Sequence, residues 1–300
     1  MSSGKAFDRD SIDLALARRL VDAQFPAWRE LPIRPVALSG WDNRTFRLGD
    51  ELSIRMPTGP WYAQQVAKEQ TWLPRLAPVL PLPIPTPVAV GEPGDGYPFP
   101  WSVYRWIAGE PAASAGLGDA VAFGEAVGGF LVALRGADAR GGPAPGEHNF
   151  FRGDPPAVYA EETERAIAAL GREGWSGAAP GADADWARGV WADALDSLWG
   201  GDPVWLHGDI AVGNLLMRDG RLSAVIDFGT SGVGDPACDL VLAWTSLEGA
   251  GRSAFRRGVG LDDATWARAK GWALWKALIV LAEDRGSVEA RTTLARLRAA

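Results

Sequence analysis

Two short segments decide how this chain is interpreted: His207-Gly208-Asp209-Ile210-Ala211-Val212-Gly213-Asn214 and Val225-Ile226-Asp227-Phe228-Gly229. Together they carry three oxygen-bearing side chains, those of Asp209, Asn214 and Asp227. Asn214 follows Asp209 by five residues on what reads as one loop, and Asp227 lies 18 residues after Asp209. This spacing of two carboxylates and one amide predicts a functional site that acts through side-chain oxygen atoms.

The sequence around these segments predicts strands and a hairpin. Residues 203–206 form a short apolar run that leads into the loop. Residues 214–217 and 221–226 flank Asp219-Gly220, a dipeptide that is typical of a tight hairpin turn. Taken alone, an Asp-Gly hairpin or an Asp-Phe-Gly triplet is common in proteins without any such site, so the hypothesis depends on their combination.

The residue types suit phosphoryl transfer from a nucleotide. Protein kinases use a loop Asp, an Asn five residues later and then an Asp-Phe-Gly triplet. The transferred group spreads negative charge over its oxygens, so an enzyme mainly positions and neutralises it. Mg²⁺ prefers oxygen ligands, which Asn and Asp supply. The carboxylate of Asp209 can accept a hydrogen bond from a hydroxyl and aim its oxygen at the phosphorus.

The bulk composition excludes several other classes of protein. The 300 residues are 47% hydrophobic and 22% charged, with a net charge of −7 and a pI of about 5.0, which disfavours nucleic acid as a partner. The absence of a long apolar run and of a secretory signal predicts a cytoplasmic protein without a membrane span. One cysteine and two histidines disfavour a disulfide or a zinc cluster, and no obligate protein partner is evident.

Patterning along the chain predicts an α+β fold with two lobes. Residues 1–106 are expected to form an N-terminal nucleotide-binding lobe with a small antiparallel sheet. Residues 107–300 are expected to form a larger helical lobe with the catalytic loop and the acceptor site. The helices are expected over 8–31, 60–73, 118–135, 156–171, 183–199, 236–247, 252–259, 263–284 and 287–299, and further strands over 35–38, 45–48, 52–56, 88–90 and 101–104.

The whole chain resembles the aminoglycoside phosphotransferase family, a bacterial branch of the kinase-like fold. The matching residues are 205–209 with 213–216, 226–229, and the run Gly232-Val233-Gly234-Asp235-Pro236-Ala237-Cys238-Asp239-Leu240, where protein kinases carry an activation loop instead. The resemblance implies Mg²⁺ and ATP or GTP as cofactors. It implies a small acceptor that carries hydroxyl groups, and a cationic acceptor is compatible with it. An aminoglycoside or related antibiotic is the leading candidate. A metabolic kinase for choline, homoserine or a sugar is the alternative, and a non-catalytic nucleotide-binding module is a further one.

The resemblance also assigns roles to the central residues. Asp209 becomes the catalytic base or hydroxyl-orienting residue, and Asn214 and Asp227 become the Mg²⁺ ligands. His207 is expected to brace the loop by hydrogen bonding rather than to do chemistry. Asp235 and Asp239 are expected to be structural.

The N-terminal lobe departs from the family pattern at two places. A turn at Trp41, Asp42 and Asn43 stands where protein kinases carry a Gly-rich loop, and it is expected either to offer backbone N–H groups to phosphates or to be a turn with no ligand. The phosphate-binding Lys of the third strand is replaced by Arg55, which is expected to pair with Glu69 on the next helix. Lys68 is the other candidate cation, but its helical position is expected to direct it elsewhere.

Position alone suggests the remaining contacts. Residues 103–107 are expected to form the hinge that pairs with the nucleobase through its backbone, including Arg105 and Ile107. The polar loop 146–153 is either a solvated loop or part of the acceptor pocket. A set of acidic residues is expected either to lie on solvated helix faces or to bind ammonium groups: Glu248, Asp262, Asp263, Glu283 and Asp284.

Overall fold

The computed structural model describes residues 8–36, 40, 42–173, 175 and 182–300. Contacts along the chain divide it into two compact units. The first contains Met1–Val79, Pro83–Ala108 and Ile226–Gly229, and the second contains Leu80–Leu82, Gly109–Val225 and Thr230–Ala300. The Asp-Phe-Gly segment therefore packs with the N-terminal unit, although most of the chain around it belongs to the second unit.

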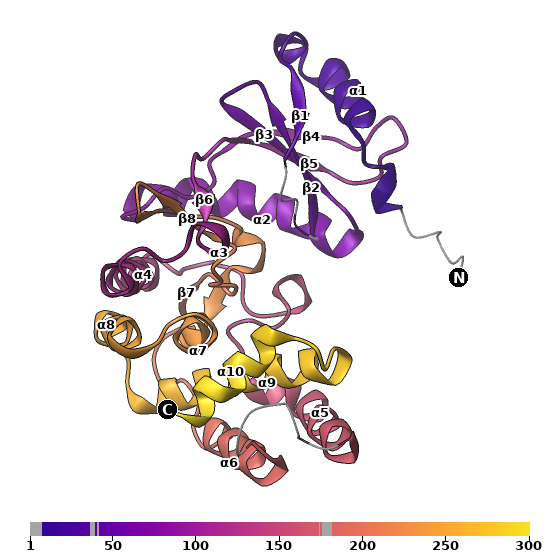
Figure 1. The fold of residues 1–300 in the computed structure, drawn as a ribbon. Helices are drawn as coiled ribbons and strands as arrows, with labels where there is room; N and C mark the ends of the chain where they lie inside the picture. Colours follow the sequence, from indigo (N-terminus) through magenta and orange to yellow (C-terminus); the bar gives the residue numbers. More distant parts are fainter. Residues whose placement is uncertain (1–7, 37–39, 41, 174, 176–181) are drawn as a thin grey trace. The chain divides into compact units, whose positions relative to one another are not determined.

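The first unit is a five-stranded antiparallel sheet with strand order β1-β2-β3-β5-β4 and two long helices (Figure 1). Register is fixed by pairs such as Ile54 opposite Val103 and Arg55 opposite Ser102. The elements are α1 (Leu14–Gln24), β1 (Ile33–Pro35), β2 (Asn43–Leu48), β3 (Leu52–Pro57), α2 (Pro60–Leu76), β4 (Pro87–Gly91) and β5 (Trp101–Arg105).

Alternation along the strands gives this sheet one apolar and one polar face. Successive side chains of a strand point to opposite faces. Ile54 and Val103 are fully buried in the apolar core that α1 closes with Leu20 and its neighbours. Their neighbours Arg55 and Tyr104 point to the other face, towards α2. The local pattern of two adjacent strands thus delivers polar groups to one place.

The second unit is mainly helical, with the long helix α9 at its centre. α9 packs against α5, α6 and α10, and α4 packs against α8. Residues of α9 such as Trp266 and Trp272 are buried. The helices are α3 (Ala112–Ala115), α4 (Ala120–Arg135), α5 (Ala160–Glu173), α6 (Ala184–Leu195), α7 (Leu242–Thr245), α8 (Gly249–Val259), α9 (Asp263–Glu283) and α10 (Val288–Arg298).

Short strands of the second unit precede and follow the loop that carries Asp209 and Asn214. β8 (Leu215–Arg218) and β9 (Arg221–Val225) form the predicted hairpin, and Asp219 and Gly220 at its turn both have positive φ. β6 (Glu110–Pro111) adds to β8. β7 (Val204–Leu206) is the predicted strand before the loop. It pairs with β10 (Gly232–Gly234), an additional strand whose two glycines disfavour a strand prediction.

Several predicted boundaries are wrong. The predicted helix 8–31 is shorter because Asp13 caps α1 at its start and Pro26 opens a separate turn after it. α2 continues through Pro74 to Leu76, beyond the predicted end. Pro74 removes one helical hydrogen bond, but the burial of Leu73 and Leu76 offsets this loss near the helix end. The predicted helices 156–171 and 236–247 both begin with a 3-10 turn, and the predicted helix 183–199 ends at Leu195.

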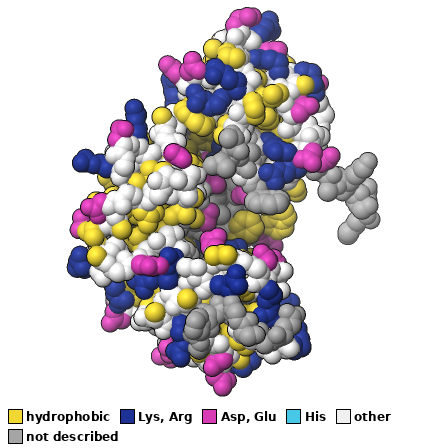
Figure 2. Space-filling view, viewed as in Figure 1, with side chains coloured by type: hydrophobic (Ala, Val, Ile, Leu, Met, Phe, Trp, Pro, Cys, Tyr) yellow, Lys and Arg dark blue, Asp and Glu magenta, His cyan; other side chains and the backbone are white. Residues whose placement is uncertain are grey.

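Among the described residues, no helix is long and apolar enough to cross a membrane. On the face drawn in Figure 2, basic and acidic side chains are interspersed over both units. The described residues on this face thus lack the broad basic surface typical of nucleic-acid binding.

Candidate functional site

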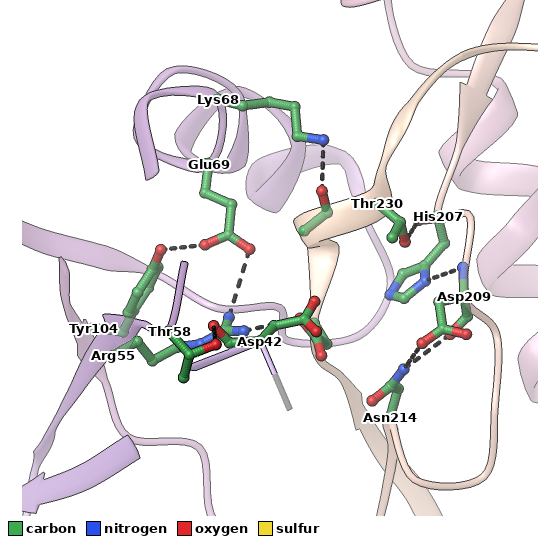
Figure 3. A network of polar contacts seen from close by, with 12 residues as sticks. Asp42, Arg55, Thr58, Lys68, Glu69, Tyr104, His207, Asp209, Asn214 and Thr230 are labelled. Atoms are coloured by element: carbon green, nitrogen blue, oxygen red, sulfur yellow. Dashed lines mark hydrogen bonds and ion pairs between the residues drawn. The ribbon is translucent and has the colours of Figure 1, made fainter. Parts of the chain in front are cut away.

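Asp209 and Asn214 are brought together by the loop that follows β7. The amide nitrogen of Asn214 donates hydrogen bonds to the carboxylate Oδ2 of Asp209 at 2.8 Å and to its backbone oxygen at 3.0 Å (Figure 3). Both acceptors require the amide nitrogen to face them, so the amide oxygen is the atom left for a metal ion. Asp209 is exposed, whereas Gly208 and Ile210 on either side are buried. The loop therefore exposes the Asp209 carboxylate to solvent, while the backbone on either side of it is buried.

The base of this loop is held by hydrogen bonds to its backbone. The buried carboxylate of Asp239 accepts from the N–H groups of His207 and Gly208, both at 2.7 Å. Burial raises the pKa of Asp239, while these two bonds act in the opposite direction. The Nδ1 atom of His207 accepts from the N–H of Asp209 at 3.2 Å, and Thr230 donates to the His207 carbonyl at 3.1 Å. His207 and Asp239 thus act as braces here, as their expected roles require.

Gly208 is required by the shape of this loop. Its φ is +83°, and a Cβ atom there would lie 2.5 Å from the backbone oxygen of Thr230. Both conditions exclude other residues without rearrangement. The Gly between His207 and Asp209 is therefore a consequence of the backbone path.

In the first unit, Arg55 joins two carboxylates. Its Nη2 lies 2.9 Å from Oδ1 of Asp227, and its Nη1 lies 3.5 Å from Oε1 of Glu69. The buried hydroxyl of Tyr104 donates a short hydrogen bond to the other oxygen of Glu69 (Figure 3). Burial alone would lower the pKa of Arg55, but Glu69 and Asp227 outweigh it and raise this pKa above its ordinary value. Arg55 is thus a permanent cation held between two acids.

Asp227 has a left-handed backbone, with φ of 68°. Non-glycine residues seldom adopt this conformation, and it costs of order 1–3 kcal/mol. Together with the ion pair to Arg55, this backbone fixes the direction of the carboxylate.

Lys68 binds the same Asp-Phe-Gly segment from α2. Its Nζ atom donates to the backbone oxygen of Gly229 at 2.6 Å (Figure 3). Burial lowers the pKa of Lys68 to about 8. The expectation that Lys68 lies away from Arg55's position agrees with this geometry, but the sequence did not reveal its contact with Gly229.

The predicted phosphate-binding turn is only partly described. Trp41 lies outside the described residues. The backbone oxygen of Asp42 accepts from the N–H of Thr58 at 2.9 Å and from its hydroxyl at 3.1 Å, which ties the turn to the end of β3. Asn43 begins β2 and lines a small pocket together with Arg55, Glu69 and Tyr104. Three of the predicted residues of this lobe therefore share one pocket.

The predicted hinge residues lie at the end of β5. The Arg105 side chain is exposed and pairs with Glu51 at 3.1 Å, and its N–H donates to the Thr86 carbonyl at 2.9 Å. Ile107 follows the strand and is half-buried. Their part in nucleobase binding concerns the backbone and stays a prediction.

The acidic residues near the C-terminus make structural contacts. Asp262 caps α9 by accepting from Thr265 at 2.8 Å. Glu248 pairs with Arg296, and Asp263 pairs with Arg256 at 2.6 Å. These contacts favour the structural interpretation for the three acids over binding of ammonium groups.

The loop 146–153 is more than a solvated loop. Asn149 is fully buried, its side chain bonds the backbone at Gly146 and Arg152, and the Arg152 guanidinium donates to the Gly208 carbonyl at 3.1 Å. No local pattern in the sequence pointed to this contact, because it joins residues 56 positions apart.

Solved structures of other proteins share this fold. The aminoglycoside phosphotransferase APH(2″)-IIIa with GDP and kanamycin has a TM-score of 0.69 at 17% identity, covering 96% of this chain and 98% of its own. A streptomycin–ATP complex of APH(2″)-IIa has a TM-score of 0.60 at 17% identity, covering 96% and 97%. The macrolide 2′-phosphotransferase from Brachybacterium faecium has a TM-score of 0.58 at 22% identity, covering 95% and 97%. The fold is therefore the kinase-like α+β fold of small-molecule phosphotransferases.

The sequence itself gives the family. Residues 32–272 match the phosphotransferase enzyme family (APH), so this chain belongs to that family. It is 37% identical over 79 residues to an aminoglycoside 3′-phosphotransferase of Escherichia coli, a match that covers 26% of this chain. The chain spans about a quarter of the length of that relative, 25%. The family resemblance predicted from the motifs is confirmed.

The residues present fit the metal that the family implies. The described residues contain no cluster of three or more His, Cys, Asp and Glu side chains that would hold a metal by themselves. Mg²⁺ usually takes one or two carboxylates and completes its shell with water and substrate phosphates. The amide oxygen of Asn214 and the carboxylate of Asp227, each considered in its own unit, are donors of the type that Mg²⁺ prefers.

Proposed function

We propose that this protein is a Mg²⁺-dependent phosphotransferase that moves the γ-phosphate of ATP or GTP to a hydroxyl of a small molecule. The observation that carries the proposal is the exposed Asp209 carboxylate, fixed by the Asn214 amide at 2.8 Å above a buried, braced loop base. Membership of the phosphotransferase family supports it. The N-terminal residues 1–106 bind the nucleotide, and residues 107–300 hold the catalytic loop and the acceptor.

In this proposal Asp209 accepts a hydrogen bond from the acceptor hydroxyl and takes its proton as the oxygen attacks the γ-phosphorus. Arg55, held by Glu69, binds phosphate oxygens in place of the usual lysine. Asn214 and Asp227 hold Mg²⁺, which neutralises charge on the phosphates when bound. The turn at Trp41, Asp42 and Asn43 offers backbone N–H groups to the phosphates, and the backbone from Arg105 to Ile107 pairs with the base.

The leading acceptor is an aminoglycoside or a related antibiotic. Structures of the same fold are complexes with kanamycin, streptomycin and GDP or ATP, and one is a macrolide phosphotransferase. These names concern the other proteins, and they define which acceptors to try first. The phosphorylated hydroxyl follows from the acceptor that is found.

The test is release of ADP or GDP in the presence of Mg²⁺ with a panel of aminoglycosides, macrolides, choline, homoserine and sugars. Stimulation by an antibiotic class supports the proposal in full. Stimulation only by choline, homoserine or a sugar would replace the acceptor by a metabolic one. Nucleotide binding without turnover on any acceptor would overturn catalysis and favour a binding module.

A further inference from the structure

The Gly208–Asp209 peptide group is held from outside the motif by Arg152. The Nε atom of Arg152 donates to the Gly208 carbonyl at 3.1 Å. This carbonyl belongs to the peptide bond whose nitrogen is that of Asp209. Fixing the plane of this peptide therefore fixes the direction in which Asp209 leaves the backbone. Further bonds to the loop base come from Asp239, Thr230 and His207 itself.

Arg152 is itself held in place by aromatic rings of α9. Its guanidinium carbon lies 4.9 Å from the ring centroid of Trp272 and 5.1 Å from that of Trp275. Its Nη1 also donates to the Phe150 carbonyl at 3.3 Å. A guanidinium stacks on aromatic faces and donates in its own plane, so it meets both demands at once. An ammonium group would not reproduce this geometry.

The loop that carries Arg152 is strained. Phe150 and Phe151 have φ of 52° and 54°, two successive left-handed residues that are not glycine. Gly153 has φ of +98°, and a Cβ there would lie 2.8 Å from the Leu206 side chain. The fully buried Asn149 clasps the loop. Such strain persists where the surrounding structure enforces a conformation, and it gathers at functional sites.

We propose that Arg152 is a positioning residue that sets the orientation of Asp209 through the Gly208 carbonyl. Arg152 connects the strained loop 146–153 and α9 to the loop 207–214. The inference rests on the proposed function only for the role of Asp209, since the contacts themselves lie within the second unit. Arg152 touches the loop backbone rather than the reacting atoms, so its loss affects the geometry of Asp209 rather than nucleotide binding.

Two variants test the proposal: Arg152→Met, which removes the guanidinium but keeps an unbranched aliphatic side chain, and Arg152→Lys, which keeps the charge. A misplacement of the order of 1 Å costs about 100-fold in rate, so we expect kcat of Arg152→Met to fall on the order of 10- to 100-fold. KM values for nucleotide and acceptor should stay within about twofold. Arg152→Lys should recover only part of kcat. Arg188→Met, at an exposed arginine of α6 that pairs with Glu164, is the matched control.

Amide hydrogen exchange in the ligand-free protein tests the same idea without any turnover. Peptides that cover residues 205–215 should exchange faster in Arg152→Met and remain unchanged in Arg188→Met. Unchanged exchange of these peptides would overturn the proposal, and so would faster exchange throughout the chain, which would indicate a general loss of stability. An unaltered kcat in an active enzyme would also overturn it. If the wild-type protein transfers no phosphate to any acceptor, the proposed function fails while the exchange experiment still decides the role of Arg152.

Discussion

The guanidinium of Arg55 lies 2.9 Å from the carboxylate of Asp227, and the same group reaches Glu69 on α2. The three residues come from β3, α2 and the Asp-Phe-Gly segment, and Asp227 is 172 positions from Arg55. In the proposed function Asp227 is a metal ligand, and its carboxylate also carries the ion pair to Arg55. If Mg²⁺ binds there as we propose, it would compete with Arg55 for this carboxylate, which would make nucleotide and metal binding interdependent.

We expect Asp227→Ala to abolish the gain in nucleotide affinity that Mg²⁺ provides. Removing even an outer partner of a metal costs 10–100-fold in affinity, so removing a ligand should cost on the order of 100-fold or more. Calorimetric titration of ATP and GTP, with and without Mg²⁺, measures this gain. Asp193→Ala, at an exposed position of α6, should behave as wild type. An equal Mg²⁺ effect in both variants would exclude Asp227 as a ligand.

Asp209→Asn and Asp209→Ala should each lower turnover by roughly 10²–10⁴-fold, the usual scale of general acid–base catalysis. Nucleotide affinity should be retained because the proposed function places Asp209 at the acceptor hydroxyl rather than at the phosphates. Single-turnover kinetics with a saturating acceptor separates the two quantities. Turnover that survives in both variants would remove Asp209 from the mechanism.

Arg55→Met should destabilise the first unit, because it leaves the buried Glu69 carboxylate without its cation. Breaking a buried ion pair from one side costs on the order of 3–5 kcal/mol, and the Tyr104 hydroxyl compensates only part of it. Urea denaturation gives the free energy of unfolding. Arg34→Met, which removes an exposed pair with Asp50, should cost less than about 1 kcal/mol. Arg55→Met/Glu69→Gln should recover stability, and a double variant as unstable as Arg55→Met would contradict this account.

Lys68 should give the stability of the protein a distinctive pH dependence. Burial lowers its pKa to about 8, below the ordinary value of 10.5. Between these two pH values the unfolded chain binds more protons than the folded one, so the contribution of Lys68 to stability rises with pH. Relative to Lys68→Met, the wild type should gain on the order of 2–3 kcal/mol from pH 7 to 10.5. If the free energy of unfolding changed with pH in the same way in both proteins, Lys68 would not be desolvated.

The sequence predicts those parts of the site that depend on residues close together along the chain. The β8–β9 hairpin follows from apolar alternation around Asp219-Gly220, and the loop base follows from the run around His207 and Asp209. The family resemblance then placed Arg55 opposite Glu69, and the structure brings these two residues together. Each of these features depends on a short stretch of sequence or on a motif of known spacing.

The remaining features depend on contacts between distant segments. Arg152 reaches Gly208 across 56 positions and Lys68 reaches Gly229 across 161, so neither contact has a local signature. Helix ends failed where tertiary burial decided them, as at Leu76 beyond Pro74.

The alternation of β3 and β5 has an evolutionary consequence. Ile54 and Val103 pack in the apolar core, while their immediate neighbours Arg55 and Tyr104 line the small polar pocket. The residues of the apolar core and those that line the polar pocket are separate sets, so selection can repack the α1 side of the sheet while keeping the pocket on the α2 side. A lineage of this chain could thus gain thermal tolerance on one face and, if the other face binds the nucleotide as we propose, change its nucleotide preference there.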